Sequence, residues 1–482
     1  MKILFFAIGN IATPRLEAML ELISDHIDKG DEVFILTCNG SLGTCYVNPY
    51  KLKSVCFSCK LRFKLGVKLL NINSSNIFFL KSEVLNKNYL NKEFKSIEEL
   101  KQFEVDGINL GFGVVSFLIS ALKDHIFDLN LHRNLIFKLL RSSILVQESF
   151  LDFLNKMAMD SVYLFNGRFF DVWPVVQVCK KLGINFYIYE MGGSYFRYLL
   201  VKNQFSHDLG FCKKDIECSF DGCDKEKIEI GKTFFMDKRN RQEAIYCYTK
   251  EQQLNLLPKL FDKNKKNIII FNSSRNEFEA FDSYKMFLYN DEIDAVRRIV
   301  NDFKYEKETK FYLRVHPNLK DLNNSQINDL KRLDFERHSN LEIIWPEDVV
   351  DSYALLDNCD KALVFLSTMG VEACFWGKTS ILLAPAFYED LDCCYKPKSH
   401  EEVIKLIKSD LKPLNKRDAI KYGYWVSSFG VPYKKFKPDG PFSGKFMDTN
   451  LWDRFGFINK MKLKSLIARD RFKQLFVKKV IR

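Results

Sequence analysis

The chain has 482 residues, more than one ordinary hydrophobic core organises, so we expect two domains. Its composition, 47% hydrophobic and 28% charged residues, is that of a folded protein and excludes long disordered stretches. The net charge of +12 favours anionic partners such as nucleotides or anionic lipids, although a solvated lysine-rich surface explains it equally well. The sequence has no helix-turn-helix or RNP-type signature, so we do not expect it to bind nucleic acid.

The apolar stretches are too short for export or for crossing a membrane. The N-terminal run MKILFFAIGN is shorter than a signal peptide requires and continues directly into a strand-like segment. The longest uncharged run, residues 108–122, falls short of the roughly 20 residues of a spanning helix, which favours a buried or interfacial helix. We therefore expect a cytoplasmic protein, with peripheral attachment to the inner membrane left open. In a reducing cytosol its 13 cysteines are thiols or metal ligands.

In chain order, the first half alternates strands with helices. The expected strands and helices are residues 2–8 (strand), 14–27 (helix), 32–37 (strand), 161–167 (strand), 175–182 (helix) and 184–190 (strand). A polar, lysine-rich connector follows at residues 254–266. Alternation of this kind predicts a parallel sheet covered by helices.

A second series of the same kind follows the connector. The expected strands are residues 267–274, 310–317, 341–347, 361–367 and 379–385, and the expected helices are 284–303, 352–356 and one opening at 368. The predicted fold is α/β, with a GT-B-type architecture of two Rossmann-like domains facing an interdomain cleft. We assign residues 1–255 to an acceptor-binding domain, 256–430 to a nucleotide-sugar-binding domain and 431–482 to a basic helical tail.

Polar residues that follow the strands of the second half are the candidate donor site, because open α/β sheets bind ligands at the carboxyl ends of their strands. In RVHPN, Pro317 ends the ladder pairing and presents His316, and the imidazole and the Arg314 guanidinium can both donate to a phosphate. A structural histidine at a strand end is the plain alternative. Two serines in FNSSRNE are also suited to lie against a phosphate or sugar, or belong to an ordinary polar turn: Ser273 and Ser274.

The segment LSTMGVEACFWGK supplies a second donor element. Ser367 and Thr368 follow a strand, and Gly370 stands at the start of a helix, where backbone N–H groups and hydroxyls form an anion site. Glu372 falls in the first helical turn, where it can accept from ribose hydroxyls. A simple helix cap and a carboxylate that stabilises the helix dipole remain the alternatives.

These motifs resemble a known family. RVHPN, followed by STMGVEACFWGKTSILL and APAFY, resembles the capsular-polysaccharide glycosyltransferases that include bacterial β-Kdo transferases, and more distantly bacterial sialyltransferases with a His-Pro motif. The resemblance covers residues 267–395 and, more loosely, the first half. It implies a fold of two Rossmann domains and a CMP-activated sugar as donor. It also implies that His316 contacts the donor phosphate, that Ser367 and Thr368 bind phosphate, and that Glu372 lies near the ribose.

The resemblance also points to a catalytic base in the first half. IYEMGGS places Glu190 where these families have the acid that serves as general base, while Met191 replaces a second acid that is often present. An inverting transfer needs one carboxylate to take the proton of the acceptor hydroxyl. A surface salt bridge is the alternative role for Glu190. In FNGRFFD, Asn166 and Arg168 are candidate acceptor-binding residues.

The cysteines and the tail give two further hypotheses. Cys38, Cys45, Cys56 and Cys59, with one CxxC pair, suit tetrahedral structural zinc or are buried free thiols. A looser set comprises His207, Cys212, Cys218 and Cys223. In residues 457–482, basic residues alternate with apolar ones, a pattern that favours a cationic helix on an anionic membrane, with a helix docked on the first domain as the alternative.

From these observations we predict an inverting glycosyltransferase that needs no cofactor for its chemistry. It would use a nucleotide-activated donor, with CMP-sugar favoured, and extend an oligosaccharide or lipid-linked glycan of a capsule or O-antigen. Three alternatives remain: a nucleotide-sugar 2-epimerase, a CDP-polyol phosphotransferase, and a non-catalytic scaffold of polysaccharide assembly.

Overall fold

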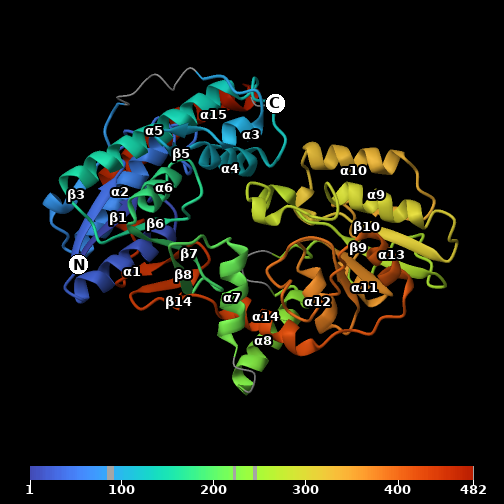
Figure 1. Ribbon diagram of the computed structural model, residues 1–482. Coiled ribbons are helices and arrows are strands. Elements are labelled where there is room, and N and C mark those ends of the chain that lie inside the picture. Colours follow the sequence, from blue (N-terminus) through green and yellow to red (C-terminus); the bar gives the residue numbers. More distant parts are fainter. Residues whose placement is uncertain (84–91, 221–223, 243–246, 481–482) are drawn as a thin grey trace. The chain divides into compact units, whose positions relative to one another are not determined.

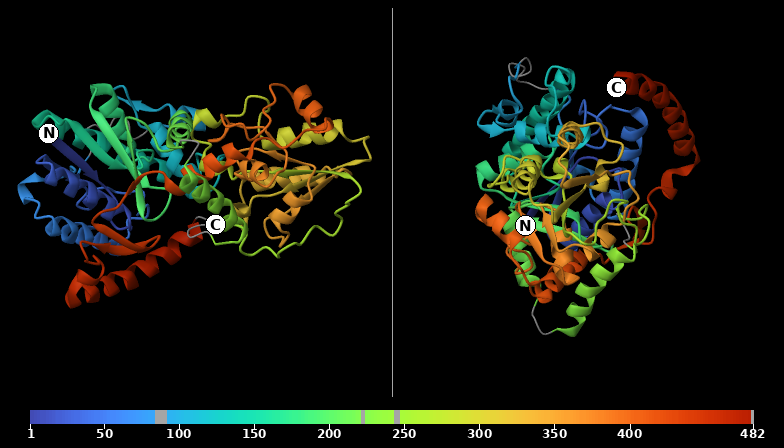
Figure 2. Two further views of the ribbon diagram at one scale, coloured as in Figure 1. Left: turned by 90° about the horizontal axis from the view of Figure 1, so that it is seen from below. Right: turned by 90° about the vertical axis from the view of Figure 1, so that its right-hand side faces the viewer.

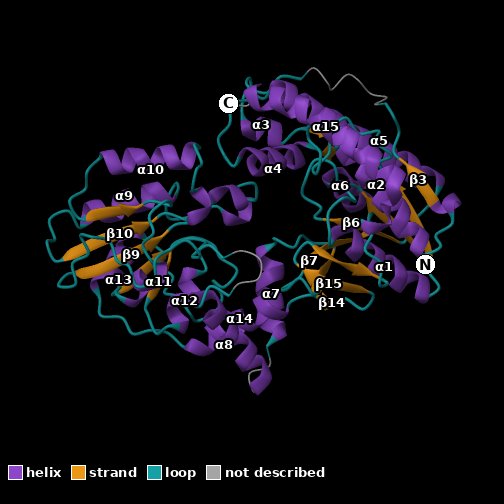
Figure 3. Ribbon diagram, turned by 180° about the vertical axis from the view of Figure 1, so that it is seen from behind, coloured by secondary structure: helices purple, strands orange, loops and turns teal. Residues whose placement is uncertain are grey.

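The computed structural model describes residues 1–83, 92–220, 224–242 and 247–480, which fold into two compact units (Figure 1). Unit 1 comprises Met1–Leu118, Phe127–Ser206 and Phe429–Arg482, and unit 2 comprises Ile119–Ile126 and His207–Ser428. Each unit contains a mainly parallel sheet with helices on both faces (Figure 3). The α/β fold with two Rossmann-like domains and a C-terminal helix is therefore confirmed.

Unit 1 is built on a seven-stranded sheet. Five neighbouring strands are parallel, and β8 and β14 add antiparallel pairs at one edge. In spatial order the strands are β14 (Val431–Pro432), β8 (Arg197–Lys202), β7 (Asn185–Met191), β6 (Ser161–Phe165), β1 (Lys2–Ala7), β2 (Glu32–Thr37) and β3 (Ile77–Phe79). Two short hairpins lie outside this sheet: β4 (Glu104–Val105) with β5 (Ile108–Asn109), and β15 (Phe436–Gly440) with β16 (Ser443–Phe446).

The core of unit 1 follows from strands that are apolar on both faces. In β1 every residue after Lys2 is buried, as expected for a parallel strand covered by helices. Phe5 packs with Met19 and Ile23 of the first helix in one cluster. The helices of this unit are α1 (Arg15–Asp28), α2 (Lys53–Leu69), α3 (Ile97–Lys101), α5 (Arg133–Lys156), α6 (Trp173–Leu182) and α15 (Gly456–Val480), and α4 (Gly111–Leu122) runs from unit 1 into unit 2.

The sheet of unit 2 has five strands, all parallel. In spatial order they are β11 (Leu341–Ile344), β10 (Thr309–Arg314), β9 (Lys266–Phe271), β12 (Lys361–Val364) and β13 (Ser380–Leu382). Because β9 lies between β10 and β12, the residues that follow these three strands meet at one edge of the sheet. This edge is where an open α/β sheet binds its ligands.

The helices of unit 2 are α7 (Leu209–Ser219), α8 (Lys225–Arg239), α9 (Glu292–Asp302), α10 (Ser325–Phe335), α11 (Ser352–Asp357), α12 (Met369–Phe375), α13 (His400–Lys408) and α14 (Lys416–Ser428). The helix expected over residues 284–303 begins only at Glu292. The Asp291 carboxylate accepts from the backbone N–H of Asp294 at 2.8 Å and so fixes the helix start there. Residues 285–291 form a non-helical segment instead.

The division of the chain also differs from the expected boundary at 255/256, because the main segment of unit 2 begins at His207. The physical reason is that α7 and α8 pack on α14, so residues 207–239 belong to the second core. Gly231 of α8 lies so close to α14 that a side chain there would meet the Ile420 carbonyl oxygen at 2.3 Å. Sequence alone gave no sign of this long-range helix contact.

The C-terminal helix α15 lies beside α2 in unit 1 (Figure 2). Asp470, the one acid among residues 457–482, accepts from the backbone N–H groups of Lys53 and Ser54 at 3.2 and 2.7 Å, and it thereby caps α2. The C-terminal helix is therefore docked on unit 1 at Asp470, which is the alternative that the sequence left open. None of the helices described is both long enough and apolar enough to cross a bilayer.

Candidate functional site

The polar residues that follow β9, β10 and β12 line one pocket of about 80 Å³ in unit 2. Five of the predicted donor residues contribute to it: Arg314, His316, Ser367, Thr368 and Glu372. The sheet topology explains why they meet, since the three strands are neighbours and parallel. The pocket therefore gathers an imidazole, a guanidinium, two hydroxyls and a carboxylate.

His316 is held so that its ring remains neutral. Its backbone N–H donates to the Asn272 side chain at 2.7 Å, and its Nδ1 accepts from the backbone N–H of Asn318 at 3.1 Å. In the neutral ring the proton therefore sits on Nε2, which makes that atom the donor. Burial and the nearby charges of Lys238 and Arg314 lower the pKa of His316 to about 4. The ring thus acts as a neutral hydrogen-bond donor across the physiological pH range.

Two buried N–H donors in this pocket have no hydrogen-bond partner among the described residues: Arg314 Nε and Asn272 Nδ2. The terminal nitrogens of Arg314 donate to the carbonyl oxygens of Trp345 and Asp348, at 2.6 and 3.3 Å, so the orientation of the guanidinium is fixed. Burial lowers the pKa of Arg314 to about 10, which still leaves it charged near neutrality. Unsatisfied buried donors are rare in native proteins, and here they suit an anionic ligand.

Glu372 forms the acidic side of the pocket. Its carboxylate accepts from Tyr353 at 2.6 Å and from Thr368 at 2.7 Å, and it pairs with Lys238 at 3.0 Å. Burial alone would raise the pKa of Glu372, but the Lys238 ammonium and the two hydroxyl donors lower it below its ordinary value. A fixed, ionised carboxylate with remaining lone pairs can accept from ligand hydroxyls.

Three of the predicted donor residues do not line this pocket. The hydroxyl and backbone N–H of Ser273 donate to Glu292, and the Ser274 hydroxyl donates to Asn276 at 2.8 Å, so both serines brace the loop after β9. Gly370 is buried in α12, where an added Cβ would meet the Tyr388 hydroxyl at 2.7 Å. This glycine is required by packing, and its backbone N–H donates to the Ser367 carbonyl oxygen at 3.3 Å.

Sequence reasoning missed Lys238, Tyr248, Thr249 and Asn272, which also line the pocket. Lys238 comes from α8, and the edge of the Tyr248 ring approaches His316 with 5.3 Å between ring centroids. Only Asn272 carried a usable signal, because it directly follows β9 in the same way that His316 follows β10. The other three come from segments before the second sheet and reach it only through tertiary packing.

A second polar cluster lies in unit 1 at the carboxyl ends of β6 and β7. Glu190 lies within β7, one residue before its end, and its carboxylate accepts from the Asn166 side chain at 2.5 Å. Burial raises the pKa of Glu190 to about 7, although Asn166, Arg168 and Arg15 act in the opposite direction. A carboxyl group that titrates near neutrality has the pKa that suits a general base.

The cluster contains two buried arginines. Arg168 was expected from the sequence and Arg15, from the start of α1, was not. The Arg15 guanidinium lies 4.4 Å from the centre of the Phe165 ring and 6.0 Å from that of Tyr46, and its Nε has no hydrogen-bond partner among the described residues. The surroundings of Glu190 are therefore cationic.

Asn166 contacts the candidate base directly. It adopts a left-handed backbone conformation with φ of 63° and donates to Glu190. Its contact with an acceptor stays a prediction. The turn after Glu190 is closely packed. An added Cβ at Gly192 would meet the Phe429 carbonyl oxygen at 2.9 Å, so this glycine allows two backbone segments of unit 1 to approach each other.

The four cysteines predicted as zinc ligands, Cys38, Cys45, Cys56 and Cys59, line one small cavity of about 30 Å³. Burial raises the pKa of Cys59 to about 11, and it also raises the pKa of Cys45 well above its ordinary value. In the part of the chain that is described, no three His, Cys, Asp or Glu side chains lie close enough to hold a metal ion. As placed, the cysteines do not fit zinc, and of the looser set Cys223 lies outside the described residues. Metal analysis of chelator-free protein tests the zinc prediction.

Comparisons with known proteins give likeness in structure only. No family model matches the chain, and no curated protein matches it. Similar solved structures include the KpsC beta Kdo 2,4 transferase of Thermosulfurimonas dismutans, at 12% identity and a TM-score of 0.36, covering 55% of this chain and 80% of the other.

Two further similar structures cover more of the chain at lower scores. A UDP-GlcNAc 2-epimerase from Neisseria meningitidis bound to UDP-GlcNAc has 11% identity and a TM-score of 0.29, covering 88% of this chain and 97% of the other. MurG of Acinetobacter baumannii has 11% identity and a TM-score of 0.26, covering 91% and 96%. At such identities the functional conclusion has to come from the two polar clusters themselves.

Proposed function

We propose that the chain is an inverting glycosyltransferase of GT-B type that transfers a sugar from a nucleotide-activated donor to a growing surface polysaccharide. The observation that carries the proposal is the pocket around His316, where predicted donor residues and two unsatisfied buried donors, Arg314 Nε and Asn272 Nδ2, occur together. The family resemblance of RVHPN and STMGVEACFWGK supports a CMP-activated donor in particular.

In the proposed reaction, Glu190 takes the proton of an acceptor hydroxyl as that oxygen attacks the anomeric carbon. The bond between the anomeric carbon and the phosphate oxygen breaks, and the nucleotide leaves with its negative charge. The His316 Nε2–H, the Arg314 guanidinium and the Ser367 hydroxyl donate to that phosphate. Thr368, whose hydroxyl donates to Glu372, holds the carboxylate that accepts from the ribose. Donors fixed in advance at a developing charge are the largest usual contribution to catalysis of this kind.

The epimerase alternative is less favoured by the residues. A 2-epimerase needs several acids around the sugar ring, and among the described residues Glu372 is the one carboxylate that lines the His316 pocket. A CDP-polyol phosphotransferase and a non-catalytic scaffold both remain compatible with a nucleotide pocket. Measured transfer of a labelled sugar separates the proposal from both.

Nucleotide binding gives the direct test. Thermal unfolding of the full chain is measured with CMP, CDP and UDP; a ligand at 100 times its dissociation constant stabilises by about 2.7 kcal/mol. His316→Ala should weaken nucleotide binding by about tenfold or more, as expected for a hydrogen bond to a charged group. His338→Ala, a histidine paired with Glu336 and absent from the pocket lining, is the matched control. Equal binding by both variants would refute the donor assignment.

A membrane-bound acceptor is part of the same proposal. The start of α15 exposes Phe457, Ile458 and Met461, at 79%, 81% and 52%, among the basic residues Lys460, Lys462 and Lys464. Apolar side chains flanked by cations suit an anionic bilayer surface, where lipid-linked glycans are found. Side chains from Phe472 to the end of the chain lie outside the described part.

Vesicle binding tests this surface. Phe457→Ser with Ile458→Ser should lower co-sedimentation with phosphatidylglycerol vesicles, while Phe335→Ser, at an equally exposed phenylalanine of unit 2, should not. Binding that is the same for both variants, or that is insensitive to salt, would contradict the proposed membrane contact.

A further inference from the structure

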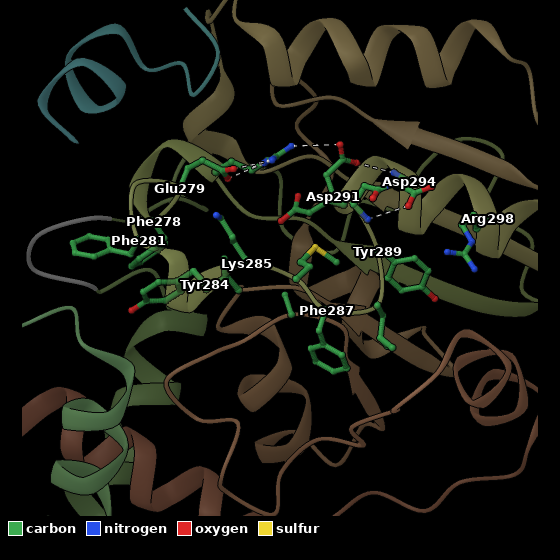
Figure 4. Close-up of a pocket in the computed structure, with 17 residues that line it drawn as sticks. Phe278, Glu279, Phe281, Tyr284, Lys285, Phe287, Tyr289, Asp291, Asp294 and Arg298 are labelled. Carbon is green, nitrogen blue, oxygen red and sulfur yellow. Dashed lines mark hydrogen bonds and ion pairs between the residues drawn. The ribbon is translucent and has the colours of Figure 1, made fainter. Parts of the chain in front are cut away.

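A second and larger cavity, of about 450 Å³, opens in unit 2 (Figure 4). Its volume is within the range of about 300–1,000 Å³ that is usual for small-molecule sites. Most of its lining comes from the segment between Arg275 and Asp294, and Leu366 and Ala384, which follow β12 and β13, complete it. It shares no lining residue with the His316 pocket, although Leu366 directly precedes Ser367.

One side of the cavity is aromatic. The rings of Phe278 and Tyr284 stack with 4.7 Å between their centroids, and Phe281 lies near them (Figure 4). Phe287 also lines the cavity and is 70% exposed. An exposed ring has a flat apolar face, and the C–H bonds on one side of a pyranose form a complementary apolar face. Aromatic rings offer such contact area at little cost in side-chain entropy.

The other side is polar, but its charges are largely paired within the protein. The Arg275 guanidinium donates to both carboxylate oxygens of Glu279 at 3.2 and 3.1 Å, and it lies 3.7 Å from the Asp291 carboxylate. Asp294 accepts from the backbone N–H of Asn290 at 3.1 Å. The lining contains four acids and three bases: Glu279, Asp291, Glu292 and Asp294, with Arg275, Lys285 and Arg298.

This balance distinguishes the cavity from the His316 pocket. There, Arg314 and Asn272 each have a buried donor without a partner, which a phosphate would satisfy. The lining of the larger cavity contains at least one carboxylate for each cation, so a phosphate bound there would meet as much repulsion as attraction. Paired carboxylates keep free lone pairs, and a guanidinium has five N–H donors, so both can still bind hydroxyl groups. An uncharged ligand with many hydroxyls and an apolar face fits this combination.

We propose that this cavity binds an uncharged pyranose residue of the acceptor glycan, as a site separate from the nucleotide pocket. The proposal rests on the proposed function, because a transferase that extends a polysaccharide must hold a chain longer than its terminal residue. Phe287 supplies the stacking face, and the Arg275–Glu279–Asp291 group binds the hydroxyls. The sugar of the donor has the same chemistry, and the experiment separates these two sources.

The test measures binding to the full chain by saturation-transfer NMR, with CMP, UDP, UDP-glucose and a panel of methyl pyranosides as probes. The panel contains the methyl glycosides of glucose, galactose, N-acetylglucosamine and N-acetylgalactosamine, with that of Kdo as an acidic member. At least one neutral glycoside should bind, and Phe287→Ala should weaken it by about two- to tenfold, the usual range for one aromatic contact. Phe335→Ala, which removes a comparably exposed ring on α10, should leave binding unchanged.

Four outcomes would overturn the proposal: no neutral glycoside binds, only the Kdo glycoside binds, the two phenylalanine variants behave alike, or Phe287→Ala weakens UDP-glucose as much as it weakens the glycoside. The last outcome would assign the cavity to the donor's sugar. Failure of the proposed function has a different signature. Wild-type protein that binds a glycoside through Phe287 and binds neither nucleotide would refute the transferase assignment and leave the sugar site intact.

Discussion

The two polar clusters occupy the same place in their sheets and handle protons in opposite ways. In unit 2, burial and neighbouring cations lower the pKa of His316 to about 4, so the ring keeps one proton on Nε2 and does not titrate near neutrality. In unit 1, burial raises the pKa of Glu190 to about 7. One cluster is suited to hold an anion without exchanging a proton, and the other to exchange a proton.

Burial alone therefore does not decide the role of a site. Desolvation is the largest influence on both groups, and it favours the neutral form of each. For an imidazole the neutral form is a hydrogen-bond donor with a fixed proton. For a carboxyl it means a group poised between its two protonation states at pH 7, which is the condition for general-base catalysis. The same change made in both clusters should therefore have different consequences.

Glu190→Gln should have the largest effect. Glutamine preserves the size of the side chain and can still hydrogen-bond to Asn166, but it cannot accept a proton. General-base catalysis contributes about 10²–10⁴-fold, so turnover should fall at least about a hundredfold while nucleotide affinity stays nearly unchanged. Steady-state kinetics with a labelled donor measure this. Loss of nucleotide affinity would instead assign Glu190 to the donor, and Glu104→Gln, at an exposed acid of unit 1, is the matched control.

Glu372→Gln is the same change in unit 2 and should act on binding. The substitution removes the charge that pairs with Lys238 at 3.0 Å and weakens the acceptor that a ribose hydroxyl would use. We expect donor affinity to fall by about tenfold, the effect of one hydrogen bond to a charged group, with a smaller change in turnover at saturation. Titration with nucleotide measures it. A large loss of turnover with unchanged affinity would reverse the roles of the two carboxylates.

The sequence predicted the pocket residues that follow strands better than the pocket residues that belong to distant segments. Arg314, His316, Ser367, Thr368 and Glu372 line one pocket because each stands at the end of a strand, in the loop after it or in the first turn of the following helix. Three of the partners that complete the pocket come from distant segments: Lys238, Tyr248 and Thr249. Their position at the pocket depends on packing contacts, such as that of α8 on α14, which no local sequence pattern encodes.

Two errors have a common physical origin. The helix expected over residues 284–303 overlaps the segment that bounds the larger cavity, and Ser273, for which a donor role was expected, lies two residues before that segment. There Asp291 delays the helix start, and buried Glu292 accepts from Ser273. Serine, asparagine and acidic residues occur both in turns and helix caps and in polar helices, so composition does not separate these structures. Tertiary hydrogen bonds decide between the two, and they are not visible along the chain.

The pH dependence of turnover should follow Glu190 and not His316. A base with a raised pKa is deprotonated only above that pKa, so kcat should be flat above about pH 7 and fall as pH decreases. One pH unit below a pKa leaves about a tenth of the base ionised, so activity at pH 6 should be about tenfold below its plateau. His316, with its pKa lowered to about 4, should add no step in this range. A profile without an acid limb near neutrality would contradict the assignment of Glu190 as base.

Arg15 should shift the acid limb of the pH profile of turnover. This is the smallest of the expected effects. Its positive charge favours the ionised form of Glu190 and lowers its pKa, against the larger effect of burial. Arg15→Met removes that charge, so the acid limb should move to higher pH. Because one pKa unit corresponds to tenfold in ionisation, activity at pH 6.5 should fall by less than about tenfold while activity on the alkaline plateau changes less. Arg15→Lys keeps the charge and should return the limb toward its original position. A uniform loss at every pH in both variants would mean that Arg15 acts through packing on Phe165 and Gly9, where its guanidinium also lies.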